Sequence, residues 1–242
     1  MPENPLLPHR KLSELYLRML RCRELERELA RQRGAAKKFG AREALLAATS
    51  IQLSPGDLLC SEAGDISAEE LAPLGKDGKT PGSLNAALDT RLATCAGAAR
   101  GITASVGGGL VLAYTRAGST EPGWAEALAW AHEQRVPLIV VCEDAANGGA
   151  RGKTKPDTLS WPAMQKLAKK LRLPILAVDG ADAVAVYRVM QESVIRARHN
   201  DGPAVIWAVT SPKSAKLPSS QQSLGRLKRY LKTRSIPLPT QR

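Results

Sequence analysis

The chain has 242 residues, of which 43% are hydrophobic and 24% are charged, and its formal net charge is +12. These values are ordinary for a globular protein, and no apolar run approaches the length that a membrane-spanning helix needs. The chain contains a single Phe, so its core must be built from Leu, Ile, Val and Ala, which favours a Val/Ile-rich parallel sheet covered by helices.

The positive charge is concentrated near the C-terminus. Residues 211–242 hold eight Lys or Arg residues and no Asp or Glu. Such a segment could contact nucleic acid or an acidic partner, and this alternative is kept open. Because aromatic residues that stack on bases are not interleaved with the cations, a solvated basic segment is expected instead.

Four cysteines stand far apart and show no CxxC spacing: Cys22, Cys60, Cys95 and Cys142. Three of them lie in apolar runs, so reduced, buried thiols and a cytoplasmic location are expected. The N-terminus has no apolar signal core. No HxH, HExxH or Cys/His cluster occurs, and no zinc site is expected.

A long amphipathic helix is predicted near the start of the chain, over residues 13–33. Its apolar residues recur at three- and four-residue spacing, and Ser13 is the expected N-cap. A second helix is predicted from about Ala41 to Leu53, and a short extended piece at Leu58–Cys60 follows a turn.

The segment between residues 61 and 105 is predicted to contain a loop followed by a helix. Residues 61–82 are polar and rich in Gly and Pro, which predicts a loop with at most one short helix. Residues 83–105 are rich in small side chains and predict a buried helix.

Strands and helices alternate in the remainder of the chain. Continuous apolar runs predict strands at 110–114, 137–143, 174–180 and 204–210. Periodic segments between them predict helices at 124–135, 161–173 and 183–198. Either Asp182 or Asp179 is expected to cap the last of these helices.

This alternation is typical of an α/β fold with a doubly wound, mostly parallel sheet flanked by helices. Three regions are predicted: an N-terminal helical extension over 1–39, the α/β domain over 40–210, and a basic C-terminal segment with a helix over 211–242. Ligands of such sheets bind at the carboxyl ends of the strands. The candidate site is therefore the loops that follow Tyr114, Glu143 and Val209.

Six segments in this order resemble one known family. They read LYLRMLRCRELERELARQ, GAREAL, LSPGD, EALAWAHEQRVPLIVVCED, VDGADAVAVYRVMQESVIRARHNDGPAVIWAVT and SLGRLKRYLKTRSI. The chain resembles the alpha subunit of thiamine-diphosphate-dependent 2-oxo acid dehydrogenases, the pyruvate and branched-chain dehydrogenase component 1. The resemblance implies a thiamine-diphosphate-binding fold and runs from about Leu12 to Pro237.

The family's cofactor motif, by this resemblance, is Gly-Asp-Gly followed after about two dozen residues by Asn-Asn. Its Asp and its second Asn bind the Mg²⁺ that bridges the diphosphate. Alignment on EALAWAH places Thr115, Arg116 and Ala117 at Gly-Asp-Gly, and Asp144 and Ala145 at Asn-Asn. Both side-chain ligands are therefore absent, because an Arg offers only donors and an Ala offers nothing.

Glu121 is the remaining motif residue, and it is one of two expected pairing partners of Arg116. Arg116 is expected to fill the vacated metal position and to pair with Glu121 or Asp144. The alternative is a diphosphate held without a metal, or with Asp144 as a displaced ligand. In that case further cations would help from the loop after Glu143, namely Arg151, Lys153 and Lys155. Two acidic residues, Glu62 and Asp65, stand where the family has Arg and His.

A non-catalytic, alpha-subunit-like scaffold or interaction protein is the leading expectation, with no cofactor. It is expected to form a homodimer, with the helix within NAALDTRLATCAGAARG as a candidate face. The alternative is a functional 2-oxo acid dehydrogenase component, with thiamine diphosphate and Mg²⁺. By the resemblance, a separate beta chain would then supply the glutamate that activates the cofactor.

Overall fold

The computed structural model describes residues 7–32, 42–61, 82–84, 90–104, 108–145, 157–210 and 222–239. Its strands are β1 (Leu58–Cys60), β2 (Gly82–Ser83), β3 (Val111–Arg116), β4 (Leu138–Ala145), β5 (Ile175–Asp179) and β6 (Ala204–Thr210). Its helices are α1 (His9–Gln32), α2 (Glu43–Ser50), α4 (Arg91–Ala104), α5 (Trp124–Glu133), α6 (Trp161–Leu171), α7 (Ala183–Arg198) and α8 (Ser223–Thr233).

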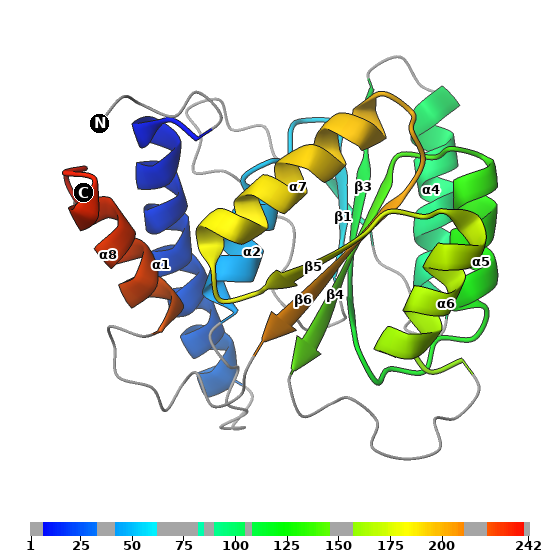
Figure 1. Cartoon of the computed structure of the whole chain (residues 1–242), viewed down its shortest axis with the longest axis horizontal. Coiled ribbons are helices and arrows are strands. Elements are labelled where there is room, and N and C mark those ends of the chain that lie inside the picture. The colour runs from blue at the N-terminus through cyan, green and yellow to red at the C-terminus, as the bar shows by residue number, and fades with distance from the viewer. Residues whose placement is uncertain are drawn as a thin grey trace.

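The strands form one six-stranded sheet in the order β2-β1-β3-β4-β6-β5, and every strand pair in it is parallel. Helices α4, α5 and α6 cover one face (Figure 1). Helices α2 and α7 cover the other face, with α1 and α8 outside them. The predicted doubly wound α/β fold is therefore confirmed.

Two apolar clusters hold these layers together, because successive side chains of a strand point to opposite faces. One lies between the sheet and α2/α7 and includes Leu112, Val141 and Ile206. The other lies between the sheet and α4, α5 and α6 and includes Val140 and Trp207. Both faces of the central strands are buried, which explains why those strands read as continuous apolar runs.

Most predicted elements occur within a few residues of their expected bounds, and the exceptions have local causes. Ser13 does not cap α1 but lies inside it, because the helix begins at His9, directly after a proline. Asp182 is the N-cap of α7, where its side chain accepts hydrogen bonds from the backbone N–H groups of Val184 and Ala185. The short strand β2 lies in a region predicted to be loop and helix start.

A buried carboxylate fixes the turn that leads into β1. Asp57 is fully buried and accepts hydrogen bonds from the backbone N–H of Ser54 at 2.6 Å and of Leu110 at 2.9 Å. It also pairs with Arg198 at 2.8 Å. Since Arg198 lies at the end of α7, this one side chain joins β1, β3 and a helix packed on the sheet.

All four cysteines are free and buried, as predicted. The pKa of Cys22 is raised to about 12, mainly by burial and in smaller part by neighbouring Glu26. The thiol therefore stays protonated at neutral pH, and a thiolate is the form that reacts with alkylating reagents.

We expect that none of these thiols reacts with Ellman's reagent at pH 8 in the folded protein, and that all four react in urea. The folded state also retains the Cys22 proton to a higher pH than the unfolded state does. Stability should therefore fall as pH rises from 9 toward 12. Rapid labelling of Cys22 in the folded chain would contradict this expectation.

Candidate functional site

The two halves of the predicted cofactor motif lie side by side at the carboxyl edge of the sheet. In the register of β3 and β4, Thr115 pairs with Cys142 and Arg116 pairs with Glu143. Ala145 is the last residue of β4, two positions beyond Glu143. The structure thus brings the described motif residues Arg116 and Ala145 to the ends of two adjacent strands.

The first half of the motif forms a turn that is held by hydrogen bonds within it and to the end of β4. The hydroxyl of Thr115 donates to Glu121 at 2.8 Å, and Glu121 is almost completely buried. The hydroxyl of Ser119 donates to the carbonyl of Arg116 at 2.7 Å. The backbone N–H of Ala117 donates to the carbonyl of Glu143 at 2.9 Å, which fixes the turn to the end of β4.

One face of this edge carries a buried ion pair. Since alternate residues share a face, Arg116, Glu143 and Ala145 lie on the side of the sheet that α2 and α7 cover. The Nε atom of Arg42, just before α2, lies 2.8 Å from a Glu143 carboxylate oxygen. Thr210 donates to the other oxygen at 3.3 Å.

Asp144 lies on the opposite face, toward α5 and α6. Its Oδ2 accepts a hydrogen bond from the indole N–H of Trp207 at 3.0 Å, and its Oδ1 is buried without a hydrogen bond. Burial raises the pKa of the nearby Cys142 thiol, and the carboxylates of Asp144, Glu121 and Glu143 raise it further. Cys142 is therefore a neutral core thiol and not a nucleophile.

These residues do not fit a Mg²⁺ ion at the two positions that the family motif uses. Mg²⁺ requires oxygen ligands in a near-octahedral arrangement. Arg116 and Ala145 supply no side-chain oxygen, and the carboxylate of Asp144 faces the other side of the sheet. Within the described ranges, no group of three or more His, Cys, Asp or Glu side chains could hold a metal ion.

Some predicted contributors lie outside the described residues. These are the cations of the loop after β4 and the acidic pair that follows β1: Arg151, Lys153, Lys155, Glu62 and Asp65. Their roles stay predictions. The predicted pairing of Arg116 with Glu121 or Asp144 also stays a prediction; the contacts described for those two acids are with Thr115 and Trp207.

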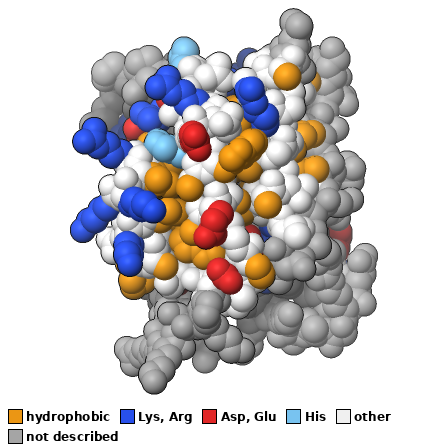
Figure 2. Space-filling view, turned by 90° about the vertical axis from the view of Figure 1, so that its right-hand side faces the viewer, with side chains coloured by type: hydrophobic (Ala, Val, Ile, Leu, Met, Phe, Trp, Pro, Cys, Tyr) orange, Lys and Arg blue, Asp and Glu red, His pale blue; other side chains and the backbone are white. Residues whose placement is uncertain are grey.

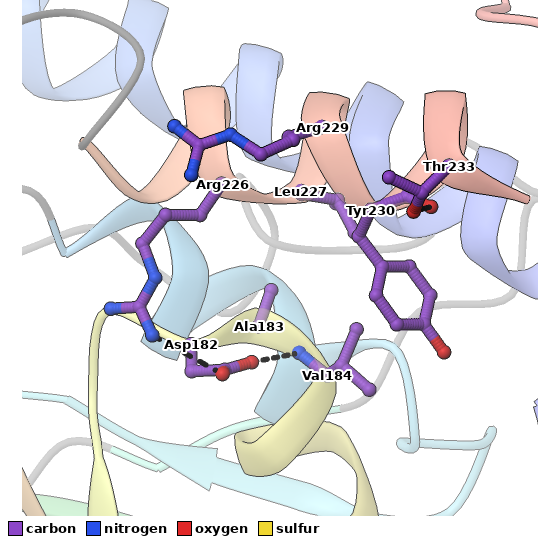
Figure 3. Close-up of a pocket in the computed structure, with 8 residues that line it drawn as sticks. All are labelled: Asp182, Ala183, Val184, Arg226, Leu227, Arg229, Tyr230 and Thr233. Atoms are coloured by element: carbon purple, nitrogen blue, oxygen red, sulfur yellow. Dashed lines mark hydrogen bonds and ion pairs between the residues drawn. The ribbon is translucent and has the colours of Figure 1, made fainter.

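A cavity of about 270 Å³ lies between α7 and α8 (Figure 3). Arg226 of α8 reaches the carboxylates of Asp179 at 2.7 Å and Asp182 at 3.2 Å. Leu227 and Tyr230 also project from α8 into the lining (Figure 3). The cavity lies beside β5, two strands away from β4, and contains none of the motif residues. It is therefore separate from the candidate site.

The fold and the motif positions together define a class of protein. An open parallel α/β sheet whose ligand motif spans the ends of two adjacent strands is the fold of the thiamine-diphosphate-binding enzymes. Residues 84–211 match the family described as the dehydrogenase E1 component. The chain belongs to this family.

One relative and two solved structures illustrate the similarity. The alpha subunit of the pyruvate dehydrogenase E1 component of Porphyra purpurea is 38% identical over 76 residues, which cover 31% of this chain and 22% of the relative. A protein of Mycobacterium smegmatis described as a thiamin diphosphate-dependent enzyme is 13% identical, with a TM-score of 0.50, over 71% of this chain and 32% of its own.

The second structure, benzoylformate decarboxylase of Polynucleobacter necessarius, has a TM-score of 0.47 at 11% identity. It covers 71% of this chain and 33% of its own length. The chain thus spans about a fifth of the sequence relative and about a third of each structural neighbour.

The expectation that the chain has no cofactor is wrong in the light of these comparisons. The family points to thiamine diphosphate instead of none. The error has a physical cause. Loss of two side-chain ligands weakens the bonds to a metal, but backbone N–H groups and Arg side chains also bind phosphate.

Two residues of the site were not found from the sequence: Arg42 and Glu143. Arg42 and Glu143 are about a hundred positions apart, so no local pattern could pair them. A signal existed for Glu143, because a charged residue that ends a buried strand marks the carboxyl edge. Among the described helices, none is both long enough and apolar enough to cross a membrane.

Proposed function

We propose that this chain is an alpha-subunit-like homologue of a thiamine-diphosphate-dependent 2-oxo acid dehydrogenase that serves as a scaffold and interaction subunit. It takes thiamine diphosphate at the carboxyl edge of its sheet and does not decarboxylate a 2-oxo acid by itself. The observation that supports this proposal is the presence of Arg116 and Ala145, at adjacent strand ends, in the two positions of the family's metal ligands. The location of the chain is proposed to be cytoplasmic.

In the same proposal, the chain is divided into three regions. Residues 40–210 form the cofactor-binding unit, residues 1–39 are a helical extension, and residues 211–242 are a basic segment with a helix. Helices α1 and α8 support this division, because they pack outside the layer formed by α2 and α7.

The outer face of α4, α5 and α6 is the proposed surface for association with a second copy of the chain. Figure 2 shows hydrophobic side chains gathered at the centre of this face, beside a group of basic side chains. Trp130 of α5 is 41% exposed there. On α4, Gly97 and Gly101 have open space where a side chain would begin, which allows another helix to approach closely.

The function is tested by two assays of the purified chain. Thiamine diphosphate should raise the midpoint of thermal unfolding, because a ligand that binds only the folded state stabilises it. Thiamine without the diphosphate serves as the control and should give no shift. With thiamine diphosphate, Mg²⁺ and an artificial electron acceptor, we expect no release of CO₂ from pyruvate or branched-chain 2-oxo acids.

Turnover by the isolated chain would contradict the scaffold proposal. The same assay with an added beta subunit of a pyruvate dehydrogenase E1 component addresses the alternative function. Turnover that appears only in that mixture would identify the chain as a functional dehydrogenase component.

A further inference from the structure

We propose that the outer edge of β5, the edge that faces away from β6, binds an extended, acidic segment of a partner protein as a further strand of the sheet. β5 is the last strand in the order β2-β1-β3-β4-β6-β5, so in the described sheet it has one neighbour. The inference goes beyond the proposed function, because this edge contains none of the motif residues and its use does not depend on a cofactor.

The backbone groups of β5 that bond to β6 can be identified from the ends of the strand. The carbonyl of Pro174 accepts a hydrogen bond from the N–H of Val205 at 3.0 Å. The N–H of Gly180 donates to the carbonyl of Val209 at 2.8 Å. Because the backbone groups of successive residues in a strand point to alternate sides, the even-numbered residues of β5 face β6.

The odd-numbered residues Ile175 and Ala177 therefore direct their N–H and C=O groups to the outer edge. In the part of the chain that the structure describes, these groups make no hydrogen bond outside the sheet. Ala177 is exposed, so the edge is accessible. A strand edge with unpaired backbone groups is a template for an added strand, whose main-chain hydrogen bonds supply the affinity.

The outer edge lacks the features that commonly prevent strand pairing, which are charged side chains, prolines and bulges along the strand. β5 reads ILAVD, and its register with β6 is regular from Ile175 to Asp179. The charge of Asp179 lies at the far end of the strand, and its carboxylate is engaged by Arg226 at 2.7 Å. The four residues before it are uncharged, so an extended segment can pair along them.

The charges beside the start of β5 determine which kind of segment fits. Lys169 and Lys170 lie in the last turn of α6 and Arg172 is its C-cap, and all three are exposed. Within the described residues, none of these three side chains has a hydrogen bond or an ion pair. Asp201, in the turn before β6, is an exposed acid at the same end of the sheet, and the three cations outnumber it. An acidic segment would therefore be attracted to this end of the edge.

A second copy of the chain fits this edge less well than an acidic segment. Pairing of two β5 strands in antiparallel register would bring two α6 helices to the same face of one sheet. Each helix, with its C-cap, carries four cations and no acid, so the two would repel each other. The acid nearest to the partner's basic end would be Asp179, whose carboxylate already pairs with Arg226.

Titration with a synthetic peptide tests the inference. The probe is a fluorescently labelled peptide, Glu-Glu-Val-Thr-Val-Thr-Val-Glu-Glu, added to the full chain at low salt and followed by fluorescence anisotropy. A peptide with lysine in place of each glutamate is the charge-reversed control. The acidic peptide should bind, with an affinity that falls as salt is raised, and the basic peptide should not bind.

Amide hydrogen exchange measured by NMR shows where the peptide lies. With the acidic peptide bound, exchange at Ile175 and Ala177 should slow, because pairing covers the N–H groups that point to the outer edge. This readout uses the native chain, and binding to the cations alone would not change it.

Two pairs of variants separate the backbone contribution from the charge contribution. Ala177→Pro removes an N–H of the outer edge and keeps the bonds to β6, so peptide binding should weaken about tenfold or more. Ala177→Thr keeps that N–H and should bind like the native chain. Lys169→Gln with Arg172→Gln should weaken binding about fivefold and reduce its salt dependence. Lys228→Gln with Lys232→Gln, exposed on α8, is the control and should have no effect.

Equal binding of the two peptides, or unchanged binding by Ala177→Pro that circular dichroism shows to be folded, would overturn the inference. Unchanged exchange at Ile175 and Ala177 in the presence of bound peptide would overturn it too, and this measurement is decisive even if Ala177→Pro does not fold. Self-association that Ala177→Pro abolishes, without binding of the acidic peptide, would assign the edge to a second copy of the chain instead.

Discussion

Glutamine in place of Glu143 is expected to lower the free energy of unfolding by about 3 kcal/mol, because it leaves a buried guanidinium without its charge partner. The side chain of Arg42 is 6% exposed and that of Glu143 is 12% exposed, so water replaces little of the lost interaction. Glutamine keeps the shape of the side chain and can still accept the hydrogen bond from Thr210. Urea unfolding followed by circular dichroism measures the loss.

The exposed Glu133→Gln on α5 is the control for this experiment and should change stability little. A double replacement, Arg42→Met with Glu143→Leu, should recover most of the loss. Buried ion pairs can be exchanged for apolar side chains of similar volume at little cost in stability. If Glu143→Gln were as stable as the native chain, the pair would not be a support of this edge.

Alanine in place of Asp57 is expected to cost roughly 4 kcal/mol, since it leaves one buried N–H group, one partly buried N–H group and part of a guanidinium without an acceptor. The three groups are the backbone N–H of Ser54, the backbone N–H of Leu110 and the side chain of Arg198. The loss should appear as a lower urea midpoint with an unchanged slope.

Asp201→Ala serves as the control for Asp57, because Asp201 is an exposed aspartate in the turn after α7. Asn at position 57 should restore part of the stability, since its amide oxygen can accept from one or both N–H groups. A loss from Asp57→Ala no larger than that from Asp201→Ala would show that the turn is held by other contacts.

Much of the fold could be predicted from the sequence, and the reason lies in the central strands. Runs such as PLIVVCE are buried on both faces, so they show as continuous apolar segments between amphipathic helices. The order of the strands could not be predicted in this way. Nothing in the periodicity of PILAVDG indicates that β5 lies at the edge of the sheet, outside β6.

The composition of the site was predicted only in part. Arg116 and Ala145 lie at neighbouring strand ends, because adjacent parallel strands bring their carboxyl ends to one edge, and their role in a site stays a prediction. The partners of Glu143 could not be foreseen, since they are the residue before α2 and the last residue of β6, far away in the chain. Contacts between distant segments depend on the packed structure and not on local pattern.

The position of β6 between β4 and β5 has a consequence for synthesis of the chain. While the protein emerges from a ribosome, β5 appears before β6. In the described sheet, β6 is the one strand beside which β5 lies. Until β6 follows, both β4 and β5 expose an unpaired apolar edge, which is a template for association with other chains. The nascent chain therefore passes through a stage that is prone to aggregation, and assistance by a chaperone would have its greatest effect between the synthesis of Ile175 and Thr210.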